Sequence, residues 1–152
     1  MRKYHVIVLG GGFAGCAAAI AAARNGCNTL LVEQSGYLGG AAANCLVNPF
    51  MPYSTTVEKD GKTETLVLSR GIFREICERL EQEGALSGHV FHEEYLKLVL
   101  DSMVMEAGVQ VLFHSVLTDV IATENNLKGI TVINKGGKQT FEAEYFIDCT
   151  GD

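Results

Sequence analysis

The chain has 152 residues, of which 47% are hydrophobic and 20% charged, and its formal net charge is −6. These values are typical of one globular domain with a core of its own. The net negative charge gives no sign of a basic surface that would bind nucleic acid or an anionic membrane. The five cysteines are odd in number and contain no C-x-x-C pair. This pattern argues against a disulfide framework and against a metal site, and it favours a reducing, cytoplasmic setting.

A strand, a glycine-rich turn, a helix and a second strand are predicted in that order at the N-terminus. The apolar, β-branched run 4–9 is typical of a strand buried on both faces. It leads into Gly10-Gly-Gly-Phe-Ala-Gly15 and an alanine-rich helix over 13–25. The second buried strand covers 27–32, and Glu33 stands at its carboxyl end.

This order is the one that binding of the ADP part of a dinucleotide requires. Gly10 permits the tight turn out of the strand, and Gly12 lets the backbone approach a pyrophosphate because it has no Cβ atom. Gly15 lets the helix pack close to the sheet, and the helix N-terminus offers free N–H groups and a partial positive charge. Glu33 lies where a ribose would bind.

Two other interpretations of the N-terminus fail. The glycines interrupt the apolar run, and Arg24 and Asn25 close it, which argues against a secretory signal or a membrane anchor. A phosphate loop of the mononucleotide type needs Lys-Ser or Lys-Thr after the glycines, but Cys16 and Ala17 stand there.

A second glycine pair and an insertion follow. Gly39 and Gly40 indicate a backbone that comes close to another group, and a plain flexible loop is the alternative. Farther along, an Asp-Gly pair between two threonine-containing runs is a strong hairpin signal, so we expect a hairpin that projects from the sheet. Its parts are the strand 53–59, the turn Asp60-Gly61 and the strand 62–68, all within an insertion of about 45–90.

The remaining sequence predicts two amphipathic helices and five strands. The helices cover 71–84 and 92–107, and a short buried strand covers 109–113. An antiparallel meander follows over 115–123, 127–134 and 138–142, and a last buried strand covers 145–149. The order predicts an α/β fold: a Rossmann-like parallel sheet with helices on its faces, plus a three-stranded antiparallel β-meander.

Three motifs carry a resemblance to a known family: Gly10-Gly-Gly-Phe-Ala-Gly15, Glu33 followed by Leu38-Gly-Gly40, and the end motif Ile147-Asp-Cys-Thr-Gly-Asp152. Together they resemble the FAD-dependent oxidoreductases that share the glutathione-reductase type of FAD-binding domain, and within them a bacterial subgroup related to the fumarate reductase flavoproteins. The meander is also a trait of that domain. The resemblance implies FAD as the cofactor, because an NAD-binding domain needs neither the second glycine pair nor the Thr-Gly-Asp strand end.

The resemblance also implies a set of cofactor-binding residues. Glu33, with Gln34 beside it, would accept hydrogen bonds from the adenosine ribose, and its charge would repel a 2′-phosphate. Val116 would contact the adenine through its backbone. The residues implied at the pyrophosphate, on the flavin side and at the strand end are Gly10, Gly12, Phe13, Ala14, Gly15, Gly39, Gly40, Ala41, Thr150, Gly151 and Asp152.

The implied activity is transfer of hydride or electrons between the bound flavin and an unidentified organic substrate. Family members continue with a helix and a substrate domain, so residues 1–152 are interpreted as the N-terminal portion of an incomplete FAD-binding domain that is inactive alone. We expect a small-molecule substrate, no nucleic acid and no membrane partner, and self-association stays open. A non-catalytic nucleotide-binding module, an NAD-binding dehydrogenase domain and a flavin-dependent protein of the thiazole-biosynthesis type are the alternatives.

No catalytic residue is predicted. The four histidines show no partner spacing, and we expect structural roles for them. Cys45 follows the second glycine pair and is the one cysteine considered for a redox role, although no second cysteine lies nearby in the sequence. Cys16, Cys27 and Cys149 are expected to be small buried hydrophobic residues.

Overall fold

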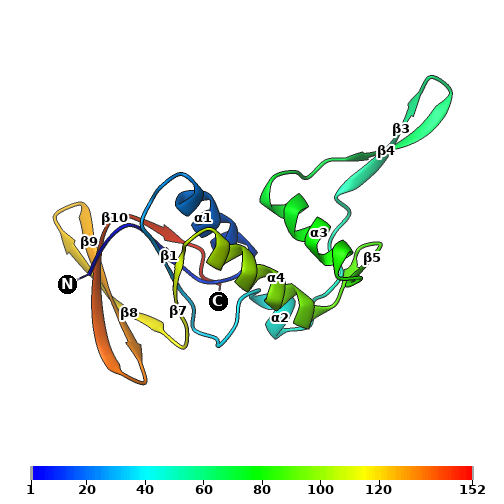
Figure 1. Ribbon diagram of the computed structural model, residues 1–152. Helices are drawn as coiled ribbons and strands as arrows, with labels where there is room; N and C mark the ends of the chain where they lie inside the picture. Colours follow the sequence, from blue (N-terminus) through cyan, green and yellow to red (C-terminus); the bar gives the residue numbers. More distant parts are fainter. Residues whose placement is uncertain (1, 152) are drawn as a thin grey trace.

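A mixed six-stranded sheet organises residues 2–151, which are the residues that the computed structural model describes (Figure 1). Its strand order is β7-β2-β1-β10-β9-β8. The first four of these strands run parallel to one another, and the last three form an antiparallel meander. The strands are β1 (Arg2–Leu9), β2 (Thr29–Val32), β7 (Gln110–Leu112), β8 (Val116–Thr123), β9 (Asn126–Asn134) and β10 (Gly137–Asp148).

A helical layer lies on one side of the parallel strands: α1 (Phe13–Arg24) packs on the strands, α4 (Glu93–Glu106) packs on α1, and α2 (Ala41–Asn44) and α3 (Ile72–Gln82) pack on α4. The small side chains of α1 allow it to pack closely on the sheet, and Cys16 and Ile20 are fully buried against Val8 and Leu31. Leu100 of α4 belongs to the same core. The two amphipathic helices and the N-terminal strand–helix–strand unit predicted from the sequence are therefore confirmed.

The meander covers the opposite face. Ile7 and Leu9 of β1 point away from the helices and pack with Ile130, Val132 and Phe141 of the meander strands. All five side chains are nearly or fully buried. The parallel strands thus lie between a helical layer and the antiparallel meander of the same sheet. This arrangement confirms the predicted α/β fold with a three-stranded meander.

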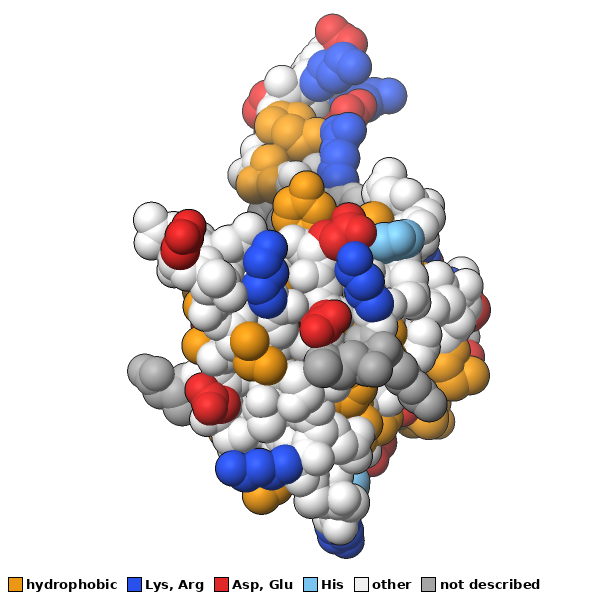
Figure 2. Space-filling view, turned by 90° about the vertical axis from the view of Figure 1, so that its left-hand side faces the viewer, with side chains coloured by type: hydrophobic (Ala, Val, Ile, Leu, Met, Phe, Trp, Pro, Cys, Tyr) orange, Lys and Arg blue, Asp and Glu red, His pale blue; other side chains and the backbone are white. Residues whose placement is uncertain are grey.

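A two-stranded hairpin stands away from this body (Figure 1). It consists of β3 (Ser54–Lys59) and β4 (Lys62–Val67), joined by Asp60 and Gly61, which both have positive φ. Positive φ at both central residues is what a tight two-residue hairpin turn requires, so the Asp-Gly prediction is confirmed. Figure 2 shows the same arm rising above a face on which side chains of both charge signs are interspersed.

The insertion also contains elements that the sequence did not predict. A short hairpin joins β5 (Leu86–Ser87) to β6 (Val90–Phe91), and Pro49 forms an isolated bridge with Val90. Phe50 lies at the centre of an aromatic cluster and contacts the rings of Phe13, Phe73 and Phe91 at centroid distances of 5.7, 5.1 and 4.4 Å. The base of the insertion is therefore attached to the first residue of α1.

Two expectations about the C-terminal strands are wrong. The third meander strand and the last parallel strand are one continuous strand, β10, which pairs with β9 over residues 137–142 and with β1 over 141–148. Its second half is not buried: Tyr145 is 68% exposed and Ile147 is 36% exposed. β7 is likewise only half-buried, because it is an edge strand.

Within residues 2–151, no helix is long and apolar enough to cross a membrane.

Candidate nucleotide-binding site

The glycine turn lies at the carboxyl ends of the parallel strands. Gly10 follows β1 directly, has φ +92°, and donates its backbone N–H to the carbonyl oxygen of Val32 at 2.8 Å. A Cβ atom on Gly10 would lie 2.6 Å from the carbonyl oxygen of Cys149. Glycine is thus required here both by the left-handed backbone and by the strand end of β10 beside it.

Gly12 is the N-cap of α1, and the space beside it is open. A Cβ atom on Gly12 would have the Cα of Gly40 as its nearest neighbour, at 3.9 Å. No side chain caps the helix, and its first turn contains no acidic residue. The N–H groups of this turn therefore have no partner within the helix and lie beside this open space, which forms a cradle of the kind that binds an anionic group.

The second glycine pair forms the other side of this cradle. The N–H of Gly39 donates to the carbonyl oxygen of Gly11 at 2.9 Å. Gly39 and Gly40 both have positive φ, and a Cβ atom on Gly40 would lie 3.0 Å from the Cα of Gly12. The pair is an ordered turn packed on the first glycine motif, which excludes the plain flexible loop. Ala41 begins α2 beside it and has an exposed side chain.

Glu33 is held by backbone donors. Its Oε2 accepts from the N–H of Gly11 and its Oε1 accepts from the N–H of Ser35, both at 2.6 Å, and the residue is only 5% exposed. A carboxylate oxygen can accept two hydrogen bonds, so each oxygen of Glu33 can still accept one from a ribose hydroxyl. The sequence predicted the position of Glu33 but not these two bonds, because neither donor carries a side-chain signal.

The strand end of β10 lies beside the glycine turn. The N–H of Cys149 donates to the carbonyl oxygen of Leu9 at 2.8 Å. Thr150 and Gly151 follow, and both residues are exposed. Oδ1 of Asp148 accepts both from the Thr150 hydroxyl, at 2.7 Å, and from its N–H, at 3.0 Å. These hydrogen bonds lower the pKa of Asp148. Asp152, the last predicted site residue, lies outside the described residues.

The other predicted residues surround the same edge. Phe13 is half-buried against Phe50, while Ala14 is exposed in the first turn of α1. Gln34 is exposed beside Glu33. Val116 begins β8, and its side chain is 46% exposed. The structure thus gathers the three sequence motifs at one edge of the sheet, although they are far apart in the chain.

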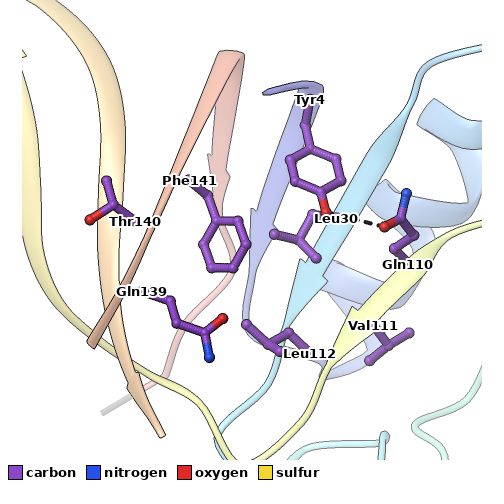
Figure 3. Close-up of a pocket in the computed structure, with 8 residues that line it drawn as sticks. All are labelled: Tyr4, Leu30, Gln110, Val111, Leu112, Gln139, Thr140 and Phe141. Atoms are coloured by element: carbon purple, nitrogen blue, oxygen red, sulfur yellow. Dashed lines mark hydrogen bonds between the residues drawn. The ribbon is translucent and has the colours of Figure 1, made fainter. Parts of the chain in front are cut away.

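Two cavities at the surface lie elsewhere. One, of about 380 Å³, lies between the parallel sheet and the meander, and includes Tyr4, Gln110 and Phe141 (Figure 3). The other, of about 500 Å³, lies between α3 and α4. Neither contains a residue of the glycine motifs. An extended ligand needs a groove along several strand ends rather than a deep hole, so the glycine edge remains the candidate site.

Cysteines and histidines form no site among residues 2–151, where no group of three or more His, Cys, Asp or Glu residues can hold a metal ion. His5 accepts from the N–H of Asn28, and His92 caps α4 by accepting from the N–H of Glu94, so both have the structural roles expected. Cys16 is buried as expected, and Cys27 and Cys149 are half-buried. Cys45 is exposed.

The observed cradle fits FAD on its own geometry. It offers an uncapped helix N-terminus, a Cβ-free backbone at Gly12 and Gly40, and a backbone-anchored carboxylate at Glu33, in the order that phosphates and ribose require. No positive side chain is needed at such a site, because the N–H groups and the helix dipole supply the complementary charge.

Comparison with known proteins agrees with this assignment. The family model for FAD dependent oxidoreductases matches residues 5–152. A curated relative, digeranylgeranylglycerophospholipid reductase 2 of Methanothermobacter thermautotrophicus, is 28% identical over 98% of this chain. The chain spans only 40% of the length of that relative.

Solved structures share the fold. The 3-ketosteroid dehydrogenase of Rhodococcus jostii RHA1 matches 99% of this chain and 46% of its own, with a TM-score of 0.68 and 14% sequence identity. THI4 of Thermovibrio ammonificans matches 98% of this chain and 58% of its own, with a TM-score of 0.64 and 20% identity. At such identities the likeness shows the fold alone. The match of the family model over residues 5–152 shows that the chain belongs to the FAD-dependent oxidoreductase family.

Proposed function

We propose that residues 2–151 hold the ADP part of FAD along the glycine edge, in an oxidoreductase that passes hydride or electrons between the flavin and a small organic substrate. The observation that carries the proposal is the open cradle at Gly12, which faces the uncapped N-terminus of α1 and is closed on its far side by Gly40. When bound, the flavin supplies the redox chemistry, and the protein supplies position and electrostatic environment.

Each motif has a distinct task in this proposal. The N–H groups that follow Gly12 bind the pyrophosphate, and the backbone at Gly39 and Gly40 contacts the cofactor from the opposite side. Glu33 accepts from the ribose hydroxyls, and its negative charge disfavours a ligand with a 2′-phosphate at this position. Thr150 and Gly151 approach the cofactor from the end of β10.

A Gly12→Val variant tests the proposal without disturbing the fold. Gly12 has an ordinary extended backbone, with φ −71° and ψ −174°, and the nearest atom to an added Cβ is 3.9 Å away. The first side-chain carbon of valine thus meets no clash, and its branched side chain would fill the cradle. Ala21→Val adds a branched side chain to an exposed position of the same helix and is the matched control.

The purified proteins should be compared by visible absorption and by identifying the nucleotide that denaturation releases. We expect flavin bands and released FAD from the wild type and from Ala21→Val, and at least about tenfold less FAD in Gly12→Val. Because bound FAD itself raises the thermal midpoint, stability is compared after the proteins have been freed of nucleotide, and Gly12→Val should then unfold at the wild-type temperature. Equal FAD content in Gly12→Val, or tight NADH binding without any FAD binding in the wild type, would refute the proposal.

A further inference from the structure

His114 belongs to a loop that is hydrogen-bonded to the segment carrying Glu33. The N–H of His114 donates to the carbonyl oxygen of Ser35 at 3.0 Å, and the N–H of Ser115 donates to the carbonyl oxygen of Glu33, also at 3.0 Å. The N–H of Glu33 in turn donates to the carbonyl oxygen of Leu112 at 2.9 Å. These bonds place residue 114 beside the backbone of Glu33 and Ser35, and Glu33 is the residue that binds the ribose in the proposed function.

The imidazole ring of His114 lies against the backbone of Gly36. A Cβ atom on Gly36 would be 2.7 Å from Cε1 and 2.9 Å from Nε2 of the ring. The backbone of Gly36 does not have positive φ, so its conformation alone does not demand glycine. The absence of a side chain at position 36 is therefore explained by the ring that occupies the space.

The ring is exposed, and its backbone is strained. His114 has φ +51°, a left-handed conformation that a non-glycine residue adopts at an energetic cost. No hydrogen bond or ion pair of its ring is found within residues 2–151. The fold thus holds an aromatic ring at the protein surface, in a costly backbone conformation, beside the ribose-binding residue.

We infer that the imidazole of His114 forms a wall on which the adenine base of the bound nucleotide stacks, an inference that rests on the proposed function. In the proposed function the ribose hydroxyls donate hydrogen bonds to Glu33, and the base is joined to this ribose. The base must therefore lie close to the two loops, 33–35 and 112–115, that the backbone hydrogen bonds join. Stacking on an aromatic ring suits a base because every base presents a π-face. The side chain of Val116, 46% exposed two residues later, adds an apolar neighbour.

Two substitutions separate stacking from a structural role. Asparagine tolerates left-handed backbone well, so His114→Asn removes the aromatic face without adding strain. His114→Phe keeps an aromatic face and removes the ring nitrogens. His5→Asn is the control, because His5 is also exposed but lies beside Asn28, which precedes β2, whereas Glu33 follows β2 at its other end.

The test measures binding of ADP and of inorganic pyrophosphate by calorimetry, with protein that has been freed of nucleotide. We expect His114→Asn to bind ADP about tenfold more weakly than the wild type, to bind pyrophosphate with unchanged affinity, and to unfold at the same or a higher temperature. His114→Phe should retain ADP affinity within about threefold, and His5→Asn should match the wild type.

The contrary outcomes are distinct. Unchanged ADP affinity in His114→Asn, an equal loss of pyrophosphate affinity, or an equal loss of ADP affinity in His114→Phe overturns the inference and leaves the proposed function standing. Absence of ADP binding by the wild type overturns the proposed function, and the role of His114 falls with it.

Discussion

The carbonyl oxygen of Gly10 lies 1.7 Å from the point at which a Cβ atom of Gly15 would stand. Helix α1 can therefore begin this close to the end of β1 only because residue 15 is glycine. The contact is with backbone, which cannot rotate aside as a side chain can. The spacing of the glycine motif thus reflects the close packing of α1 on β1 as well as the approach of the ligand to the backbone.

Gly15→Ala should destabilise the protein by at least about 3 kcal/mol, because the clash forces α1 away from the sheet. Gly26→Ala is the matched control: Gly26 has φ +84° but nothing within 4 Å of an added Cβ atom, so only the backbone strain of about 1 kcal/mol applies. Urea unfolding measures both. Similar losses in the two variants would show that strand and helix separate more easily than their contact indicates.

Glu33→Ala should weaken both the fold and ADP binding. The carboxylate satisfies the N–H groups of Gly11 and Ser35, and a buried donor left unpaired costs about 1–3 kcal/mol. ADP binding should fall at least tenfold, because the ribose loses its acceptor. Thermal unfolding and calorimetry on one preparation separate the effects. Normal stability with unchanged ADP affinity would show that the two backbone bonds contribute nothing and that the ribose binds elsewhere.

Asp101 of α4 is a half-buried carboxylate whose Oδ1 has no hydrogen-bond partner within the described residues. Desolvation raises its pKa above the ordinary value of 3.8. The folded protein therefore binds more protons than the unfolded chain, and stability is lost as the pH rises from about 4 through the folded pKa.

Asp101→Asn should accordingly raise Tm by an amount on the order of 2 °C at pH 7, with the gain disappearing below pH 4, where the wild-type carboxyl is protonated in both states. Glu124→Gln, at an exposed turn, is the control for loss of one negative charge. Thermal unfolding between pH 3 and 8 measures the effect. A lower Tm for Asp101→Asn at pH 7 would mean that the charged carboxylate has a stabilising partner.

The cysteines should differ sharply in reactivity. Burial, followed by the nearby charges of Glu33 and Asp101, raises the pKa of the Cys16 thiol to about 12, so almost no thiolate is present at pH 8. Cys45 is exposed. Alkylation at pH 8, followed by peptide mass spectrometry, should modify Cys45 in the folded protein and Cys16 only after denaturation. Modification of Cys16 at the rate of Cys45 would require frequent opening of α1 from the sheet.

The ion pairs between α1, α3 and α4 should contribute little to stability. Glu75 is paired with both Arg24, at 2.7 Å, and Arg79, at 3.0 Å, and the hydrogen bond from Arg24 followed by the charges of both guanidinium groups lowers its pKa. The contribution of Glu75 to folding stability is present at pH values above the ordinary carboxyl pKa, and it is lost as the pH falls through the pKa of Glu75 in the folded protein. Glu75→Gln should cost less than about 1 kcal/mol in urea unfolding at low salt, and less in 1 M salt. A loss that does not depend on salt would contradict the ionic origin.

The strands that the sequence misassigned show why local pattern has a limit. Residues 138–142 and 145–149 are predicted as two strands, because Glu142 ends the first pattern and Glu144 precedes the second apolar run. In the structure β10 does not end there but changes partner, from β9 to β1, and a change of partner leaves no mark in hydrophobic periodicity. The short β5–β6 hairpin was missed for a related reason, because each of its strands has only two residues.

The sequence by itself determined the nucleotide-binding unit, because steric requirements at Gly10, Gly12 and Gly15 and the need for a carboxylate after β2 allow few other residues; the type of cofactor followed from the resemblance to the FAD-dependent family. The tertiary structure alone decided what those residues contact. The bonds from Gly11 and Ser35 to Glu33, and the packing of His114 on Gly36, join segments far apart in the chain through backbone groups and a missing Cβ atom. Every residue has a backbone N–H except proline, so no residue pattern reveals which of them will be the donor.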